Sequence, residues 1–335
     1  MRVKFFLFII LIASILSACS LGAQDSPTPG PTITPTPLPT LTPTPVVPLT
    51  ILVMPANMDK TTSDAYQKTV YDLAQQAGMR FQVLNSLTPA DLEPGLKVVI
   101  ALPPDPGIAE LAKAAPQVQF FAVNIPGVQA GGNVSVLSPS SQVDVSAFIA
   151  GYTAAMISDE YRIGMILPQG DANAQRAFYA FANGMAYYCG LCKTFYVYPV
   201  ASPAYIQIPP SESKKNYLGY ANALLNEKVY TLFVYPDLAD PDFLNQIGTT
   251  GAQIIGTAMP NPRPGGWVMT ITPDETKAIQ SAWPSLVAGK GGINVQSPIG
   301  IADVDPALLS PGRQRLVQQV VDDLASGRLT TGVGQ

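Results

Sequence analysis

A nearly unbroken apolar stretch lies near the middle of the chain, at residues 145–157, and reads VSAFIAGYTAAMI. Apolar residues recur in it at helical spacing, but the positions between them are also apolar or small. A helix without a polar face must be covered by protein on every side. Ser141 and Asp144 can form a capping box before it, and Ser158 opens the polar break that follows. We therefore predict a buried helix where the chain passes from one packed lobe into a second.

Before this stretch, short strand-like runs alternate with helical patterns. One helix is predicted to begin at Ser63 and to end at Gly78, because Tyr66 and Val70 lie at helical spacing between them. A shorter helix is predicted at residues 106–115. Strands are predicted at residues 50–54, 80–84, 97–102 and 118–123, and a short polar strand-like run leads into the apolar stretch. This alternation is typical of a parallel α/β sheet.

After the apolar stretch, the alternation of strands and helices starts again. Strands are predicted at residues 162–167, 194–198, 229–235, 253–257 and 267–271. Helices are predicted after Asp171, at residues 211–227 and 240–247, from residue 272, and from Ser310 to Gly327. The last helix is expected to bury Leu316. A Pro/Gly-rich break, MPNPRPGGW, is a candidate crossing back toward the first lobe.

The length of the chain agrees with two lobes, since 335 residues exceed what one hydrophobic core usually serves. The predicted parts are an export signal at residues 1–18, a linker at 19–48, a first lobe at 49–158 and a second lobe at 159–257. Part of about 258–305 is expected to return to the first lobe, and about 306–335 to join the second.

The N-terminal segment has the pattern of an exported protein. Arg2 and Lys4 precede an apolar run at residues 5–16, which is too short for a bilayer span of about 20 residues. The small residues before Cys19 resemble the lipobox of bacterial lipoproteins, by which Cys19 becomes the acylated first residue. An ordinary membrane anchor or a plain secretory signal is the alternative. We expect an extracytoplasmic protein held to the cell membrane by lipid.

The linker at residues 20–48 is rich in proline and threonine and carries almost no charge. Without apolar periodicity it cannot build a core. Alternating proline favours polyproline II, which rises about 3.1 Å per residue. We interpret this segment as a spacer between the membrane and the folded part.

Composition narrows the classes of function. Charged residues make up 13% of the chain, the formal net charge is -4, and no basic run follows the first residues, which argues against a nucleic-acid partner. The chain has no histidine, so Ser-His-Asp, Cys-His and histidine–metal chemistry are excluded. No glycine-rich phosphate loop or suggestive pair of carboxylates occurs. We predict a protein without catalytic residues, metal or other cofactor.

Cys189 and Cys192 are the only cysteines besides Cys19. The spacing C-x-x-C can indicate a redox site or half of a zinc site, but no second pair and no histidine completes a zinc shell. The pair also lies at the C-terminal end of a predicted helix. A redox-active thiolate is stabilised at the N-terminal end of a helix, so this position argues against a redox site. Because export leads to an oxidising compartment, we predict a local structural disulfide.

Several polar residues follow predicted strands, where parallel α/β sheets bind ligands. Asn57 and Asp59 follow the first strand, and two tyrosines, Tyr66 and Tyr235, lie near a strand end or the start of the next helix. Tyrosine is more often a core or rim residue than a ligand contact, and the position of these two at the ligand-binding edge is what makes them candidates. Asp171 and Asp237 are further candidates, for which a helix cap is the alternative interpretation.

Five strings in the sequence resemble the basic membrane protein family, whose members are lipoprotein solute-binding proteins that feed nucleosides to ABC importers. These strings are FFAVN (120–124), NVSVLS with AFIAGYTAAM (133–156), RIGMI (162–166), FYAFANGM (178–185) and AQIIG (252–256). The resemblance extends over most of residues 49–329. It implies the type I periplasmic binding fold, a monomer, and an ABC permease as partner.

The ligand positions of that family are only partly retained. Asp59 matches one of its paired aspartates, and Tyr66 with Gln67 stand where the family has Phe-Asn. Asn124 and Ala258 replace aspartates, and a late lysine is missing. The family holds ribose hydroxyls with carboxylates, because an ionised acceptor binds a hydroxyl more strongly than a neutral one. The resemblance therefore implies a nucleoside-like ligand but does not supply the residues that would hold it.

Together, these patterns predict a two-lobed α/β protein in which each lobe is a parallel sheet flanked by helices. We expect it to capture a small-molecule solute by hinge closure and to deliver it to an ABC permease. The alternative is a surface lipoprotein that uses the same fold for sensing or adhesion, without transport.

Overall fold

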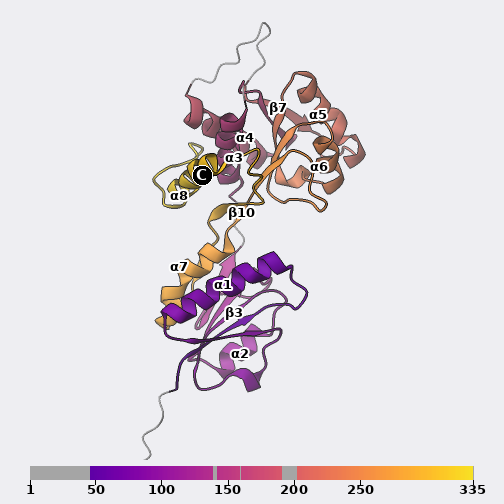
Figure 1. Cartoon of the computed structure of the whole chain (residues 1–335). Coiled ribbons are helices and arrows are strands. Elements are labelled where there is room, and N and C mark those ends of the chain that lie inside the picture. Colours follow the sequence, from indigo (N-terminus) through magenta and orange to yellow (C-terminus); the bar gives the residue numbers. More distant parts are fainter. Residues whose placement is uncertain (1–45, 139–141, 159, 191–201, 335) are drawn as a thin grey trace, which may run out of the picture. The chain divides into compact units, whose positions relative to one another are not determined.

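The structure is a computed structural model that describes residues 46–138, 142–158, 160–190 and 202–334 (Figure 1). These residues form two six-stranded sheets, each flanked by helices. The predicted strand at residues 194–198 and the predicted cap Ser141 lie outside the described residues, as do Cys19 and the export signal.

The first sheet is entirely parallel and has the strand order β11-β5-β4-β3-β1-β2. Its strands are β1 (Leu49–Val53), β2 (Arg80–Leu84), β3 (Leu96–Ala101), β4 (Gln119–Val123), β5 (Val134–Ser138) and β11 (Asn294–Gln296). Its helices are α1 (Lys60–Gln76), α2 (Ile108–Ala114) and α7 (Glu275–Val287).

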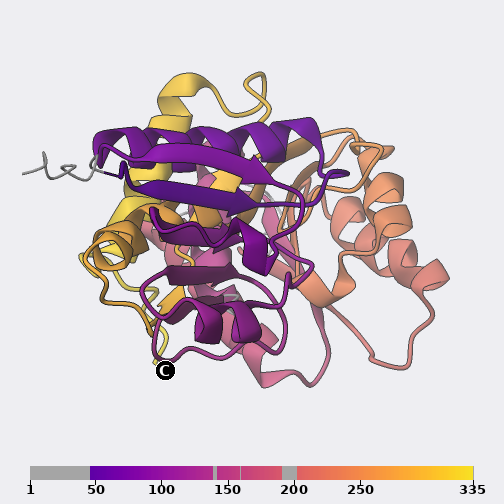
Figure 2. The same ribbon diagram turned by 90° about the horizontal axis from the view of Figure 1, so that it is seen from below.

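Two cores cover the two faces of this sheet. Residues of α1 and α7, among them Val70 and Trp283, pack on one face with Leu52, Ile100 and Phe121 of the strands. Residues of α2 pack on the opposite face. The views in Figures 1 and 2 agree, since α1 and α2 lie on opposite sides of the strands. Successive side chains of a strand point to opposite faces of the sheet, so strands covered on both faces need apolar residues at successive positions.

The second sheet has the strand order β12-β10-β9-β8-β6-β7 and is parallel except for β12. Its strands are β6 (Ile163–Pro168), β7 (Ala204–Ile208), β8 (Thr231–Val234), β9 (Gln253–Gly256), β10 (Trp267–Pro273) and β12 (Ile299–Ala302). Its helices are α3 (Val143–Ile157), α4 (Ala172–Cys189), α5 (Tyr217–Asn226), α6 (Pro241–Gly248) and α8 (Pro311–Ala325).

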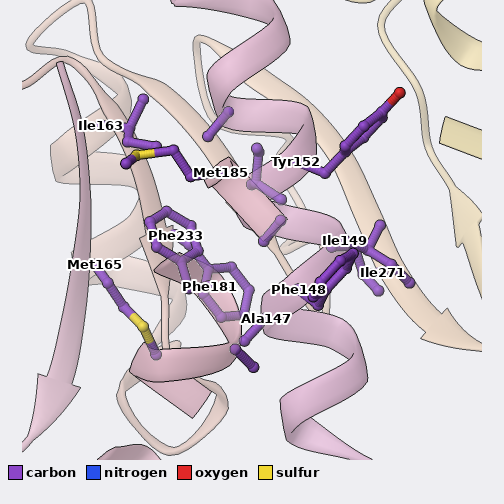
Figure 3. Packing of buried hydrophobic residues seen from close by; sticks show 14 of the residues in the cluster. Ala147, Phe148, Ile149, Tyr152, Ile163, Met165, Phe181, Met185, Phe233 and Ile271 are labelled. Carbon is purple, nitrogen blue, oxygen red and sulfur yellow. The ribbon is translucent and has the colours of Figure 1, made fainter. Parts of the chain in front are cut away.

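Helix α3 is the buried helix that the sequence predicts, and residues 146–157 are all buried. It belongs to the core of the second lobe, although the predicted boundary placed it in the first. Phe148 and Ile149 of α3 share this core with Phe181 and Met185 of α4 and with Phe233 of β8 (Figure 3). Because α3 is apolar all round, it needs partners on every side, and α4, α8 and the second sheet supply them.

Two glycines allow α3 and α4 to approach with their backbones in contact. A Cβ atom added at Gly151 of α3 would clash with the carbonyl oxygen of Phe181, and one added at Gly184 of α4 would clash with that of Phe148. The contact is therefore reciprocal, with each glycine facing the backbone of the other helix. Helices that pack this closely need small residues at the crossing point, because a larger side chain would separate the two axes.

The connectivity of the two sheets is that of the type I periplasmic binding fold, as predicted. Numbered along the chain within each lobe, the first five strands have the same order, 2-1-3-4-5. The chain passes from one lobe to the other after β5, after β10 and after β11. Each lobe therefore consists of two separate stretches of the chain.

Some local predictions were wrong. The Pro/Gly-rich break after β9 does not lead to the first lobe, because it joins β9 to β10 within the second sheet. The crossing follows β10 instead. Leu316 is 46% exposed, since α8 buries the face of Val317, Val320 and Val321. The short strands β7, β11 and β12 have no predicted counterpart.

Replacing Gly151 with alanine is expected to destabilise the fold by about 3 kcal/mol, because the added methyl group must push two backbones apart. Gly184→Ala should act in the same way. The measurement is the melting temperature followed by circular dichroism. Gly219→Ala is the matched control, because this exposed glycine in α5 has open space at its Cβ position and alanine there should add about 0.5–1 kcal/mol of stability. Equal melting temperatures for all four proteins would contradict the contact.

Candidate ligand-binding site

Three residues from distant parts of the sequence meet at the carboxyl end of the first sheet, and we call them the first half-site. Tyr66 lies on α1 and is 7% exposed, with its ring in the core beneath that helix. Asn124 directly follows β4 and adopts a positive φ of 50°. Glu275 is the first residue of α7, immediately after the N-cap Asp274. Positive φ is uncommon outside glycine but is tolerated best by asparagine and aspartate.

The carboxylate of Glu275 joins the three residues. The Tyr66 hydroxyl donates a hydrogen bond to Oε2 of Glu275, and the Asn124 side-chain amide donates one to Oε1. These contacts fix the orientation of the Asn124 amide, because the reverse orientation would place two acceptors against each other. The other amide atom, Oδ1 of Asn124, is buried and accepts no hydrogen bond from the described residues.

The environment of Glu275 disfavours its charge. Burial raises the pKa of this carboxyl group above its ordinary value of 4.5. The ion pairs among the described residues do not include Glu275. Glu275 lies in the first turn of α7, where the partial positive charge of the helix N-terminus favours its ionised form. Two neutral donors therefore hold a partly buried carboxylate that retains capacity to accept further hydrogen bonds.

A cavity of about 530 Å³ lies at the carboxyl end of the second sheet, and we call it the second half-site. It is bordered by the N-terminal turns of α3 and α4 and by the residue after β8. Its lining residues are Gln142, Val143, Asp144, Val145, Asn173, Arg176, Tyr235 and Leu324. Another cavity of about 480 Å³, bordered by Lys228 and Gln253, is at the amino end of the same sheet, away from the edge where such sheets bind ligands.

Three of the predicted site residues, Tyr235, Asp171 and Asp237, lie close enough together to interact electrostatically. Tyr235 follows β8 and is 4% exposed. Burial, together with the negative charges of Asp171 and Asp237, raises the pKa of Tyr235 to about 12. Its hydroxyl therefore stays protonated and can donate a hydrogen bond. Asp171 is the N-cap of α4, and its Oδ1 accepts from the backbone N–H groups of Asn173 at 2.7 Å and Ala174 at 2.9 Å.

The remaining predicted residues, Asn57, Asp59 and Gln67, lie in the turn after β1 and in the first turns of α1. Asn57 is exposed in the turn after β1. Asp59 is the N-cap of α1, and the backbone N–H of Thr62 lowers the pKa of its carboxyl group. The Gln67 amide donates to Oγ of Ser63 at 2.9 Å. These three residues lie near Tyr66 in the sequence but form no hydrogen bond or ion pair with Glu275.

Sequence reasoning missed Glu275 and Arg176. In the sequence, Glu275 is only one residue of the first turn of the helix predicted from residue 272, and Arg176 belongs to no recognisable motif. The signal that could have found Glu275 is its position directly after a predicted strand, at the edge where the other candidates were sought. Arg176 lies three residues after Asn173, so both are on one face of α4.

Two further observations bear on the chemistry of the described residues. Cys189 is disulfide-bonded, and its predicted partner Cys192 lies outside the described residues. Within the described residues, no three cysteine or acidic side chains gather in a way that could hold a metal ion.

None of the helices in the described part of the chain combines the length and apolar character needed to cross a membrane.

Comparisons with known proteins find similar structures but no matching sequence. Neither the protein-family models nor the curated proteins include a match to the chain. The chain is similar to an ABC transporter solute-binding protein from Conexibacter woesei, with 18% identity, a TM-score of 0.48, and coverage of 85% of this chain and 98% of that one. A transcriptional activator of the comK gene from Bacillus halodurans matches with 13% identity, a TM-score of 0.48, and coverage of 86% and 100%.

A third similar structure is a carbohydrate transporter solute-binding protein from Agrobacterium radiobacter in complex with D-arabinose. It has 11% identity, a TM-score of 0.34, and coverage of 81% of this chain and 98% of that one. With TM-scores below 0.5, these likenesses assign no function to the chain.

Glu275→Gln is expected to raise the melting temperature at pH 7 by a few degrees. Because burial raises the pKa of Glu275, the protonated form favours folding. The stability that the wild type gains from protonation of Glu275 is fully present below pH 4.5 and is lost as the pH rises through the pKa of Glu275 in the folded state. The difference between variant and wild type should therefore shrink as the pH falls below 4.5 in a series of thermal melts.

The control for this pH series is Glu110→Gln, since Glu110 is an exposed carboxylate on α2 that pairs only with Lys113. Its melting temperature should follow that of the wild type at every pH. A Glu275→Gln protein that is less stable than the wild type by the same amount at pH 7 and at pH 4 would contradict a destabilising charge.

Proposed function

We propose that the protein is a solute-binding protein that captures a small polar molecule outside the cytoplasmic membrane. The observation that carries this proposal is the first half-site, where a partly buried carboxylate without a cationic partner lies at the carboxyl end of a parallel sheet. An unpaired buried charge weakens a fold, and groups perturbed in this way concentrate at functional sites.

The chemistry of the first half-site favours a ligand with hydrogen-bond donors. Oε1 and Oε2 of Glu275 each receive one donor from the protein, and a carboxylate can accept more than two. Hydroxyl or ammonium groups of a solute would supply these donors, and hydrogen bonds to an ionised acceptor are the stronger ones. The phenol of Tyr235 adds a protonated donor in the second half-site.

Capture fits this arrangement better than catalysis. The chain has no histidine to act as a general base, and Glu275 is held by two donors without an adjacent nucleophile. In a two-lobed fold, a solute that contacts both half-sites would favour a closed form. Such a closed form is what an ABC permease would recognise.

We further propose that the chain is a member of the basic membrane protein family, with a nucleoside-like solute as the ligand. Support comes from the sequence strings of α3 and α4 and from the connectivity of the two sheets. Glu275 offers a carboxylate in the lobe where Asn124 replaces the aspartate of the family. The export signal and Cys19 support a lipid-anchored, extracytoplasmic protein. We propose a monomer because the family resemblance implies one.

A thermal-shift screen of residues 46–335 against nucleosides, bases, sugars and amino acids tests the proposal, because a ligand that binds only the folded state raises its melting temperature. For the solute that is found, Glu275→Gln should weaken binding about tenfold to a hundredfold, since hydrogen bonds to a charged group contribute roughly 1.5–3 kcal/mol. Isothermal titration calorimetry at pH 7 measures the change.

Two control variants separate the site from the fold. Tyr66→Phe keeps the buried ring and removes only the hydroxyl that positions Glu275, so its loss of affinity should be smaller than that of Glu275→Gln. Glu110→Gln should bind as the wild type does. The absence of any shift throughout the screen would overturn capture and favour the adhesion alternative.

Cys19→Ala is expected to abolish membrane association. Without the sulfur atom the lipid cannot be attached, and the apolar run before it is too short for a stable span. Cell fractionation followed by detergent phase partition measures the change, and mass spectrometry of the N-terminal peptide identifies the acyl group in the wild type. A variant that stays in the membrane fraction as the wild type does would indicate an ordinary anchor instead.

A further inference from the structure

Arg176 is a cation without a partner among the described residues. It lies on α4 and lines the cavity of the second half-site. Its Nε atom is buried and donates no hydrogen bond to any described residue. The ion pairs of the described residues do not include it. A guanidinium group in this position normally has a carboxylate or another oxyanion against it.

The acidic residues nearby have other partners. Oδ1 of Asp171 accepts from two backbone N–H groups at the start of α4. Oδ2 of Asp144 accepts from the hydroxyl of Thr331 at 3.2 Å. Neither carboxylate forms an ion pair with Arg176, although both lie on the elements that border the same cavity. Among the described residues Arg176 has no acceptor, and a bound molecule can supply one.

We propose that the cavity of the second half-site binds the carboxylate of an acid-bearing solute, with Arg176 as the residue that recognises it. This inference rests on the proposed solute-binding function and specifies its ligand. The fork of the guanidinium matches the two oxygens of a carboxylate, and Asn173 on the same face of α4 can donate from its amide. Glu275 of the first half-site then meets the hydroxyl or ammonium groups of the same solute.

A carboxylate suits this cavity better than a phosphate. Asp144 lines the cavity, and Asp171 and Asp237 lie close enough to Tyr235 to act on its hydroxyl. A group with a single negative charge can pair with Arg176 in these surroundings, whereas a doubly charged phosphate would be repelled more strongly. Hydroxy acids, sugar acids and amino acids have the required combination of one carboxylate and several donors.

The test compares probes that differ only in the acid group. D-Galacturonate is paired with D-galactose, D-glucuronate with D-glucose, and each of a set of amino acids with its amide, while glucose 6-phosphate represents phosphates. Thermal shift and calorimetry are measured on residues 46–335. We expect at least one acid to bind at least tenfold more tightly than its neutral counterpart, and glucose 6-phosphate to give no shift.

Variants of residues 46–335 test whether the preference for an acid over its neutral counterpart depends on Arg176. Arg176→Met should weaken binding of the acid by at least tenfold and leave the neutral counterpart within about twofold, and Arg176→Lys should restore only part of the affinity because it lacks the fork. Lys215→Met removes an exposed positive charge from the same lobe and should bind as the wild type does. Circular dichroism confirms that each variant is folded.

The outcomes separate this inference from the proposed function. Neutral solutes that bind as well as their acids, with affinities that Arg176→Met does not change, would overturn the carboxylate assignment and leave solute capture intact. Tight binding of glucose 6-phosphate would also overturn it. The absence of binding by every probe, charged and neutral, would contradict solute capture itself.

Discussion

The close contact between α3 and α4 is the constraint on which the second lobe depends. Gly151 and Gly184 each face the backbone of the other helix, so neither position has room for a methyl group. With this contact in place, the N-terminal turns of both helices border one cavity, and Arg176 is held at its wall. A packing requirement in the middle of two helices thus determines the geometry at their ends.

The same two glycines explain why the fold could be predicted while the site could not. Gly151 belongs to the string AFIAGYTAAM and Gly184 to the string FYAFANGM, so these two of the five strings that carry the family resemblance report packing. The alternation of strands and helices predicted both sheets for a similar reason, since periodicity reflects burial. Glu275 has no such signature, because its partners Asn124 and Tyr66 are 151 and 209 residues away in the sequence. Short strands such as β11 also lack the length that makes a pattern recognisable.

The two half-sites have opposite unpaired charges. Glu275 in the first lobe and Arg176 in the second are both partly buried, and neither forms an ion pair with a described residue. Each lobe is therefore less stable than it would be with a neutral residue in that place. A solute that brings the complementary charges would relieve both costs at once, so the binding energy and the local instability have a common origin.

The three passages of the chain between the sheets affect how the protein can be synthesised. The first lobe lacks α7 and β11 until the chain beyond β10 has been made, and the second lobe then still lacks β12 and α8. The apolar face that α7 covers, with Leu52, Ile100 and Phe121, stays open to water during most of translation. Neither lobe can be obtained alone by cutting the gene once, because a stretch of the other lobe lies between the two stretches of each. Separate lobes would require two distant coding segments to be joined.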